Sequence, residues 1–207
     1  MPVLQVYYPE GTLGGERKVA LARSLTDVLL TMEGGAKTPG GLAFASVLFT
    51  EVAQGDWWVG GHSDATYVAP PGKFLVRVSI PEGYMSQAHK SAVHAMVNAS
   101  FIDVLGGASD PRAGASVLVI LEEVIEGNWG AQGRTISLAS IADSVGLSKS
   151  GERFRWVKAY FAAKARQFAA AAYPADTGGL LPEEAGTPEP AAQGISPTRT
   201  PRYPAGL

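Results

Sequence analysis

The chain has 207 residues, a formal net charge of −2, 46% hydrophobic and 17% charged residues, and no cysteine. The lack of cysteine excludes disulfides, thiolate catalysis and cysteine-ligated metals, and the scattered charge gives no footprint for nucleic acid. Apolar stretches fall far short of the ~20 residues of a membrane span, and no signal-peptide pattern opens the sequence. We therefore expect a cytoplasmic protein with neither a nucleic-acid nor a membrane partner.

The first predicted elements form a β-α-β unit over residues 1–72. A run rich in Val, Leu and Tyr predicts a strand over residues 3–8, which a Pro-Glu-Gly turn ends. Apolar residues spaced three, four and three apart predict a helix with one apolar face. A second strand is predicted over residues 45–52, followed by a glycine- and tryptophan-rich segment that we interpret as a short hairpin. The apolar face of the helix comprises Ala22, Leu25, Leu29 and Met32.

Residues 73–145 repeat this pattern at a period of 72. Strands are predicted over residues 75–80 and 115–124, on either side of a helix that carries Val93, Val97 and Phe101 on one face. Neither half could bury its sheet alone, so we expect an α/β fold in which tandem β-α-β units form a four-stranded, mainly parallel sheet with two helices on one face. The nine identical pairs are Val6/Val78, Pro9/Pro81, Glu10/Glu82, Gly11/Gly83, Lys18/Lys90, Glu51/Glu123, Val52/Val124, Gly55/Gly127 and Trp57/Trp129.

Two further segments follow the repeat. Within residues 146–173, an apolar pattern that includes Phe154, Val157 and Phe161 predicts a C-terminal helix from about Gly151 onward. Residues 174–207 carry seven prolines and few large aliphatic residues. Because such a segment buries too little apolar surface to offset its ordering entropy, we expect a disordered tail.

Pro2 is the first candidate for chemistry. Removal of Met1 ahead of a small residue would expose Pro2 as a secondary amine. A free α-amino group has a pKa of about 7.7–8.0, and apolar surroundings or nearby cations lower this value. A neutral amine near pH 7 can transfer a proton or attack a carbonyl.

The segments PVLQVYYPEG, FTEVAQGDWWVGG and LEEVIEGNWGAQG resemble the 4-oxalocrotonate tautomerase family of the tautomerase superfamily, over about residues 2–140. The resemblance implies a fused, two-unit member that assembles as a homotrimer and needs no cofactor or metal. It also implies a tautomerase in which Pro2 is the general base or acid for enol–keto proton transfer on a small enol or 2-keto acid.

The resemblance assigns site residues one by one. Pro2 matches the catalytic position, whereas its repeat equivalent Phe74 is internal, so we expect one active centre per chain. Trp129 matches the hairpin aromatic that walls the family's pocket. Asn128 beside it could donate a hydrogen bond to an enolate oxygen. We expect Tyr7 or Tyr8 to line the same pocket.

The family's arginines are missing from this sequence. The one after the Glu-Gly turn corresponds to Thr12 and Tyr84, and the one on the second strand corresponds to Ser46 and Leu118. The residues typical of dehalogenase members are absent too, so dehalogenation of a haloacrylate is not expected. We consider two other cations as substrate anchors, namely Arg77 and Arg134.

Two alternatives remain open at this stage. The Pro2 amine could act as a nucleophile in a hydratase or decarboxylase. The chain could also be a catalytically silent binding or assembly module that kept the fold and lost the site. A metal site at His62 and Asp64 is not expected, because no third ligand accompanies them.

Overall fold

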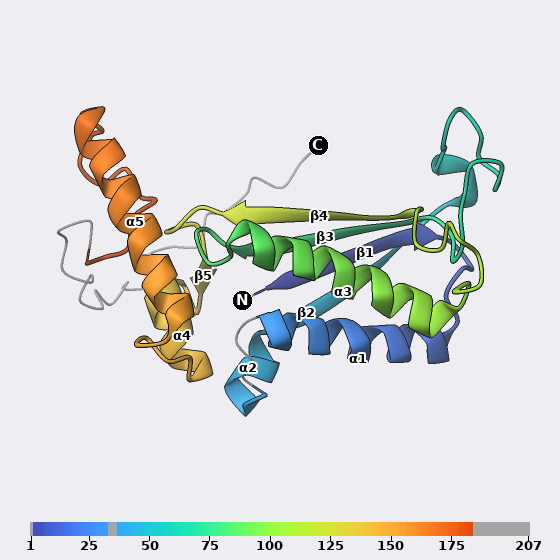
Figure 1. Cartoon of the computed structure of the whole chain (residues 1–207), viewed down its shortest axis with the longest axis horizontal. Helices are drawn as coiled ribbons and strands as arrows, with labels where there is room; N and C mark the ends of the chain where they lie inside the picture. Colours follow the sequence, from blue (N-terminus) through green and yellow to red (C-terminus); the bar gives the residue numbers. More distant parts are fainter. Residues whose placement is uncertain (1, 33–36, 184–207) are drawn as a thin grey trace, which may run out of the picture.

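The computed structural model describes residues 2–32 and 37–183 (Figure 1). Met1, residues 33–36 and residues 184–207 lie outside the described residues, and with them most of the predicted tail.

A four-stranded sheet forms the centre of the molecule. It comprises β1 (Val3–Pro9), β2 (Ser46–Val52), β3 (Phe74–Pro81) and β4 (Val117–Val124), in the order β2-β1-β3-β4. The outer pairs β1–β2 and β3–β4 are parallel, and the central pair β1–β3 is antiparallel. The expected sheet of tandem β-α-β units is confirmed, and the antiparallel pairing at its centre joins the two units.

The hydrogen-bond register repeats between the halves. Val3 pairs with Ser46, and the residues 72 positions later, Leu75 and Leu118, also pair. In the central pair of strands, Leu4 pairs with Val78 and Val6 pairs with Val76. Val76 and Val78 are the repeat equivalents of Leu4 and Val6, so the repeat converts one pair into the other. The two β-α-β units are therefore related by an approximate two-fold axis that passes between β1 and β3.

Two long helices cover one face of the sheet. Figure 1 shows α1 (Gly15–Met32) and α3 (Gln87–Leu105) side by side beneath the strands. Alternate residues of β1 and β3 point toward these helices and are buried, because successive side chains of a strand face opposite sides. The core between the layers includes Leu4, Val6, Leu21, Leu25, Val76, Val97 and Phe101.

Shorter elements complete each half. The first half adds α2 (Pro39–Phe44), which the sequence did not predict, and the 3-10 turn η1 (Gln54–Asp56). The second half contains the expected hairpin as β5 (Gly130–Ala131) and β6 (Arg134–Thr135). It then adds α4 (Leu138–Val145), also not predicted, whose N-cap Ser137 accepts the backbone N–H of Ser140.

The predicted C-terminal helix is α5 (Glu152–Ala170), which lies at one end of the sheet in Figure 1. Its buried face carries Phe154, Val157 and Phe161, as the apolar spacing indicates. The start of the expected disordered tail differs from the prediction. Leu181 is buried, because the chain returns to the domain where Gly179 N–H donates to the Glu126 carbonyl at 2.8 Å.

Within residues 2–32 and 37–183, no helix is long and apolar enough to cross a membrane. The same part of the chain contains no group of three or more side chains that could hold a metal ion.

Candidate active site at the start of β1

Pro2 lies at the entrance to β1, with its ring buried on the helix-facing side of the sheet. Its carbonyl accepts a hydrogen bond from Ser46 N–H at 3.3 Å, which joins it to the first residue of β2. Ser46 is one of the positions matched to a family arginine, so here a small side chain adjoins the proline.

The pocket around Pro2 is apolar. Its walls come from the end of α1, the end of β3, the turn after β3 and one residue of α3. The cavity measures about 10 Å³, room for about one water molecule. In such surroundings a charged amine is less well solvated than in water. The lining residues besides Pro2 are Leu29, Met32, Val78, Ile80, Pro81, Tyr84, Met85 and Val93.

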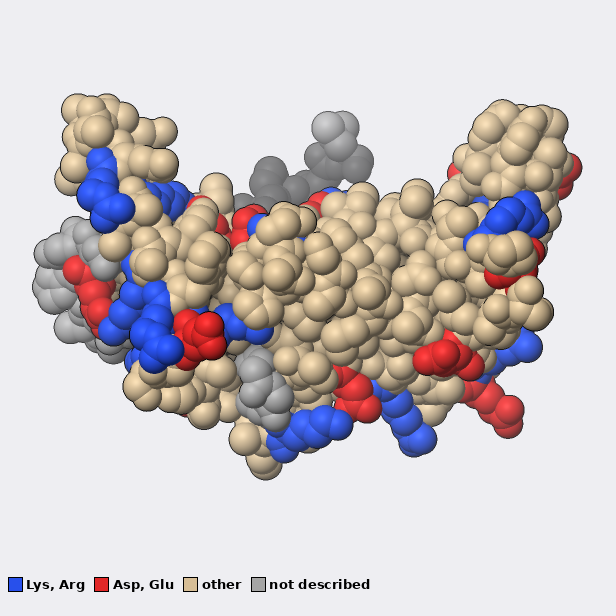
Figure 2. Space-filling model, viewed as in Figure 1, with Lys and Arg blue, Asp and Glu red and all other residues tan. Residues whose placement is uncertain are grey.

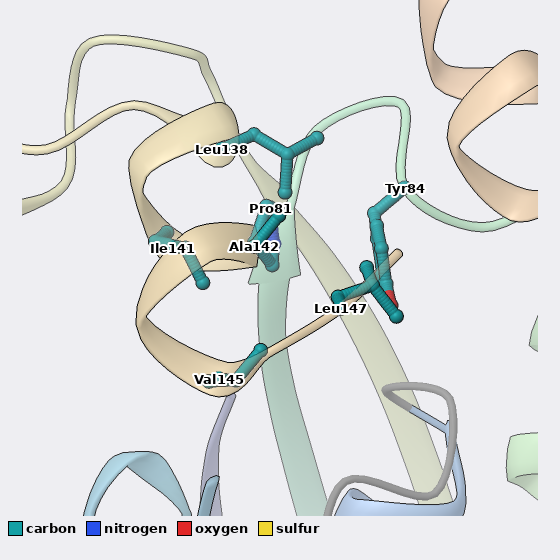
Figure 3. Close-up of a pocket in the computed structure, with 7 residues that line it drawn as sticks. All are labelled: Pro81, Tyr84, Leu138, Ile141, Ala142, Val145 and Leu147. Atoms are coloured by element: carbon teal, nitrogen blue, oxygen red, sulfur yellow. The ribbon is translucent and has the colours of Figure 1, made fainter. Parts of the chain in front are cut away.

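A second apolar pocket adjoins the first and shares Pro81 and Tyr84 with it. Figure 3 shows α4 directing apolar side chains toward the end of β3, with Leu147 beside Tyr84. The remaining lining residues are Leu138, Ile141, Ala142 and Val145. Helix α4 therefore covers the region next to the proline pocket.

The hairpin after β4 begins at the same end of the sheet as Pro2. It carries Asn128, Trp129 and Arg134. Val3 pairs with Ser79 on β3, and Pro81 pairs with Val124 at the end of β4, so the chain enters the hairpin two strands away from Pro2. These three residues do not line the pocket. The Trp129 indole N–H is buried and has no hydrogen-bond partner among the described residues.

Arg77 and Tyr7 lie together on the opposite face of the sheet. Arg77 Nε donates to Glu122 Oε1 at 3.1 Å, and this carboxylate, with Tyr7 contributing less, raises the pKa of the guanidinium. Because the helix-facing and outer side chains alternate along each strand, neither residue points into the Pro2 pocket of its own chain.

Tyr8 occupies the other end of β1. Its ring packs near Phe74, and its hydroxyl donates to Glu51 Oε1 at 3.1 Å, where Lys18 also donates at 2.9 Å. At about 3.3 Å per residue, six residues separate Tyr8 from Pro2 by about 20 Å. Tyr8 therefore belongs to the region around Phe74, the repeat equivalent of Pro2.

The sequence did not identify Tyr84 and Met85 as pocket residues. The repeat could have identified Tyr84, because this residue occupies the position matched to the missing arginine after the second Glu-Gly turn. The structure places its buried ring in the proline pocket. An aromatic ring thus lies where the family has a cation.

Buried carboxyl groups lie behind this turn. Glu82 accepts hydrogen bonds from Lys164 Nζ at 2.6 and 2.7 Å and from the Tyr160 hydroxyl at 2.9 Å. Glu126 accepts the backbone N–H of Leu138, at the start of α4, at 3.1 Å. Desolvation, opposed by that hydrogen bond, raises the pKa of Glu126 from 4.5 to about 7.

Fold and pocket together define a class: two fused β-α-β units with a proline at the start of the first strand. Among solved structures, native fused 4-OT has this fold at 24% identity and a TM-score of 0.52, covering 64% of this chain and 94% of that chain. A fused 4-OT asymmetric trimer, F6, is 22% identical with a TM-score of 0.51 and the same coverage.

N1, a member of the cis-3-chloroacrylic acid dehalogenase family, is 22% identical with a TM-score of 0.51, covering 65% of this chain and 82% of that chain. No protein-family model and no curated protein matches the sequence. The chain therefore shares the fold of these fused 4-OT structures, as its sequence segments led us to expect.

Proposed function

We propose that this chain is a tautomerase in which Pro2, freed by removal of Met1, transfers a proton between carbon and oxygen of a small enol or 2-keto acid. The observation that carries the proposal is the burial of Pro2 among apolar side chains. Low polarity disfavours the charged form of an amine, and so favours the neutral base that must take the proton.

In the proposed cycle this amine is both the base and the acid. The neutral nitrogen accepts the enol O–H proton, and the resulting ammonium returns a proton to the substrate carbon, so the amine ends as it began. Trp129 and Asn128, on the hairpin at the same end of the sheet, do not line the Pro2 cavity of their own chain, so we assign neither of them a direct contact with the enolate oxygen.

The experiment compares the wild type with Pro2→Ala in the ketonisation of phenylenolpyruvate and 2-hydroxymuconate. The proposal expects a loss of at least about 100-fold in kcat/KM, the contribution typical of a positioned general base. Lys18→Met is the matched control, because Lys18 pairs with Glu51 at the other end of the sheet. Equal rates for Pro2→Ala and wild type would refute the proposal.

Intact mass must accompany the assay, because a retained Met1 would block the amine. The small volume of the cavity is also what a catalytically silent module would have. If the protein has lost only Met1 and still ketonises neither substrate, that alternative is favoured. Trapping of a carbonyl compound on the Pro2 nitrogen by borohydride would favour a hydratase or decarboxylase.

We also propose that the chain functions as a homotrimer. The fused 4-OT proteins F6 and Q0 are trimers. In the present chain the sheet face away from the helices exposes Leu48 on β2 and Leu118 and Ile120 on β4, with exposed fractions of 47%, 59% and 45%. A second and third copy packing on this face would remove these side chains from water.

A further inference from the structure

We propose that Arg153, in the first turn of α5, anchors the substrate carboxylate, so that a helix outside the duplicated units completes the site. This inference rests on the proposed function of Pro2 and names the cation that neither repeat supplies at the matched positions.

The position of the Arg153 guanidinium carries the inference. Its central carbon lies 5.0 Å from the centroid of the Tyr84 ring, and Nη1 donates to the Met32 carbonyl at 3.1 Å. Tyr84 and Met32 both line the cavity that holds Pro2. The cation therefore rests against two walls of the proline pocket, and the ring face orients the planar guanidinium.

Two other cations near this end of the sheet already have carboxylate partners. Lys90 contacts Glu123 at 3.1 Å, and Lys164 contacts Glu82 at 2.6 Å. Among the residues that the structure describes, Arg153 forms no salt bridge with a carboxylate. Its contacts with a ring face and one carbonyl leave the guanidinium charge without an anionic partner there, and arginine has five N–H donors suited to bidentate carboxylate binding.

His89 does not compete for this role. It lies near Arg153 at the start of α3, where its Nδ1 is 2.8 Å from the Ser86 hydroxyl. Burial, followed by the charge of Arg153, lowers the pKa of His89, against a weaker opposing effect of Glu152. The imidazole is therefore uncharged at neutral pH, and Arg153 supplies the positive charge beside the pocket.

The size of the pocket directs the carboxylate toward Arg153. A cavity of about 10 Å³ admits about one water molecule, so a substrate whose reacting carbon reaches Pro2 must extend past the walls of the cavity. Tyr84 and Met32 form the wall next to the guanidinium. The burial of Phe154 and Val157 holds this turn of α5 in place.

Helix α5 gathers positive charge in this region. Figure 2 shows Lys and Arg side chains clustered over α5 at the left of the view, whereas uncharged residues dominate the middle of that face. The helix carries Arg153, Arg155, Lys158, Lys164 and Arg166 against a single acid, Glu152. This field favours the approach of an anionic substrate to the Pro2 end of the sheet.

The test compares two substrates that differ at the carboxyl group, phenylenolpyruvate and the enol of its ethyl ester, which lacks the negative charge. For Arg153→Gln we expect KM for the acid to rise about 10- to 100-fold, as for loss of a charge-assisted hydrogen bond, and KM for the ester to stay within about twofold. Arg153→Lys should recover part of the acid affinity. Arg155→Gln is the matched control, because Arg155 is exposed and donates to the Ser150 carbonyl.

A binding titration with 3-phenylpropanoate makes the inference independent of turnover. We expect Arg153→Gln, but not Arg155→Gln, to weaken this binding about tenfold or more. Equal losses on acid and ester, or unchanged acid KM and unchanged 3-phenylpropanoate binding, would overturn the role of Arg153. Undiminished activity of Pro2→Ala would instead overturn the proposed function, so the two failures are distinguishable.

Discussion

Glu82 and Lys164 connect the second Pro-Glu-Gly turn to α5, with Lys164 Nζ 2.6 and 2.7 Å from the two carboxylate oxygens. Glu82 is buried, whereas its repeat equivalent Glu10 is exposed. The same motif thus serves a solvated turn in the first half and a docking point for the C-terminal helix in the second.

Lys164→Met should destabilise the fold, because it leaves the Glu82 carboxylate buried without its cation. Loss of one partner of a buried pair costs about 3–5 kcal/mol, and the Tyr160 hydroxyl, which still donates to Glu82, should hold the loss near the lower figure. Urea denaturation measures the free energy of unfolding. The double variant Glu82→Gln/Lys164→Met should be more stable than Lys164→Met alone, and a still lower stability would contradict this account.

Gly83→Ala should be much more destabilising than Gly11→Ala. Both glycines follow the repeated Pro-Glu pair and have positive φ, +68° and +77°, so each alanine costs about 1 kcal/mol in backbone strain. A Cβ at Gly83 would also lie 2.7 Å from Cε1 of Tyr160, whereas one at Gly11 meets nothing within 4 Å. We expect Gly83→Ala to lower the free energy of unfolding by at least about 1 kcal/mol more than Gly11→Ala does, as measured by thermal unfolding. Equal decreases for the two variants would show that α5 does not pack on this turn.

Glu126 should make stability depend on pH. Because its pKa is raised from 4.5 to about 7, the folded chain holds this proton more tightly than the unfolded chain between these values. The free energy of unfolding should therefore fall, by up to about 3 kcal/mol, as pH rises from about 4.5 to 7, and be flat above.

Thermal unfolding at pH 5 and pH 8 measures this contribution. Glu126→Gln should remove it, since the amide can still accept the Leu138 N–H but cannot ionise. Glu51→Gln is the control. Lys18 lowers the pKa of Glu51, so the stabilisation from the Glu51 carboxylate is present above its unfolded pKa and stays constant between pH 5 and pH 8. Identical pH profiles for Glu126→Gln and wild type would contradict the prediction.

Leu118→Lys should break up the proposed oligomer. The substitution places a charge on the exposed sheet face where three copies would meet, and desolvating an unpaired ammonium costs several kcal/mol. Light scattering coupled to size exclusion should give a monomer for Leu118→Lys. Leu42→Lys, on α2 and 51% exposed, should keep the mass of the wild type, and an unchanged mass for Leu118→Lys would exclude this face as the interface.

The sequence alone determined the four sheet strands and the three long helices of the fold, α1, α3 and α5. The nine identities at an offset of 72, the apolar spacing around Leu25 and Val97, and the Pro-Glu-Gly turns located both β-α-β units and their faces. These patterns are local, because the apolar periodicity of a strand or helix can be recognised within a few consecutive residues. The position of Pro2 at the start of the first strand was determined in the same way.

Only the tertiary structure decided what surrounds Pro2. The antiparallel pairing of β1 with β3 brings Ile80 and Tyr84 to the proline and carries Tyr8 to the far end of the sheet. The docking of α5, through Lys164 on Glu82, then sets Arg153 against Tyr84. These contacts join residues up to 82 positions apart. Their partners are selected by packing and charge burial across the whole domain, which the local periodicity of a segment does not reveal.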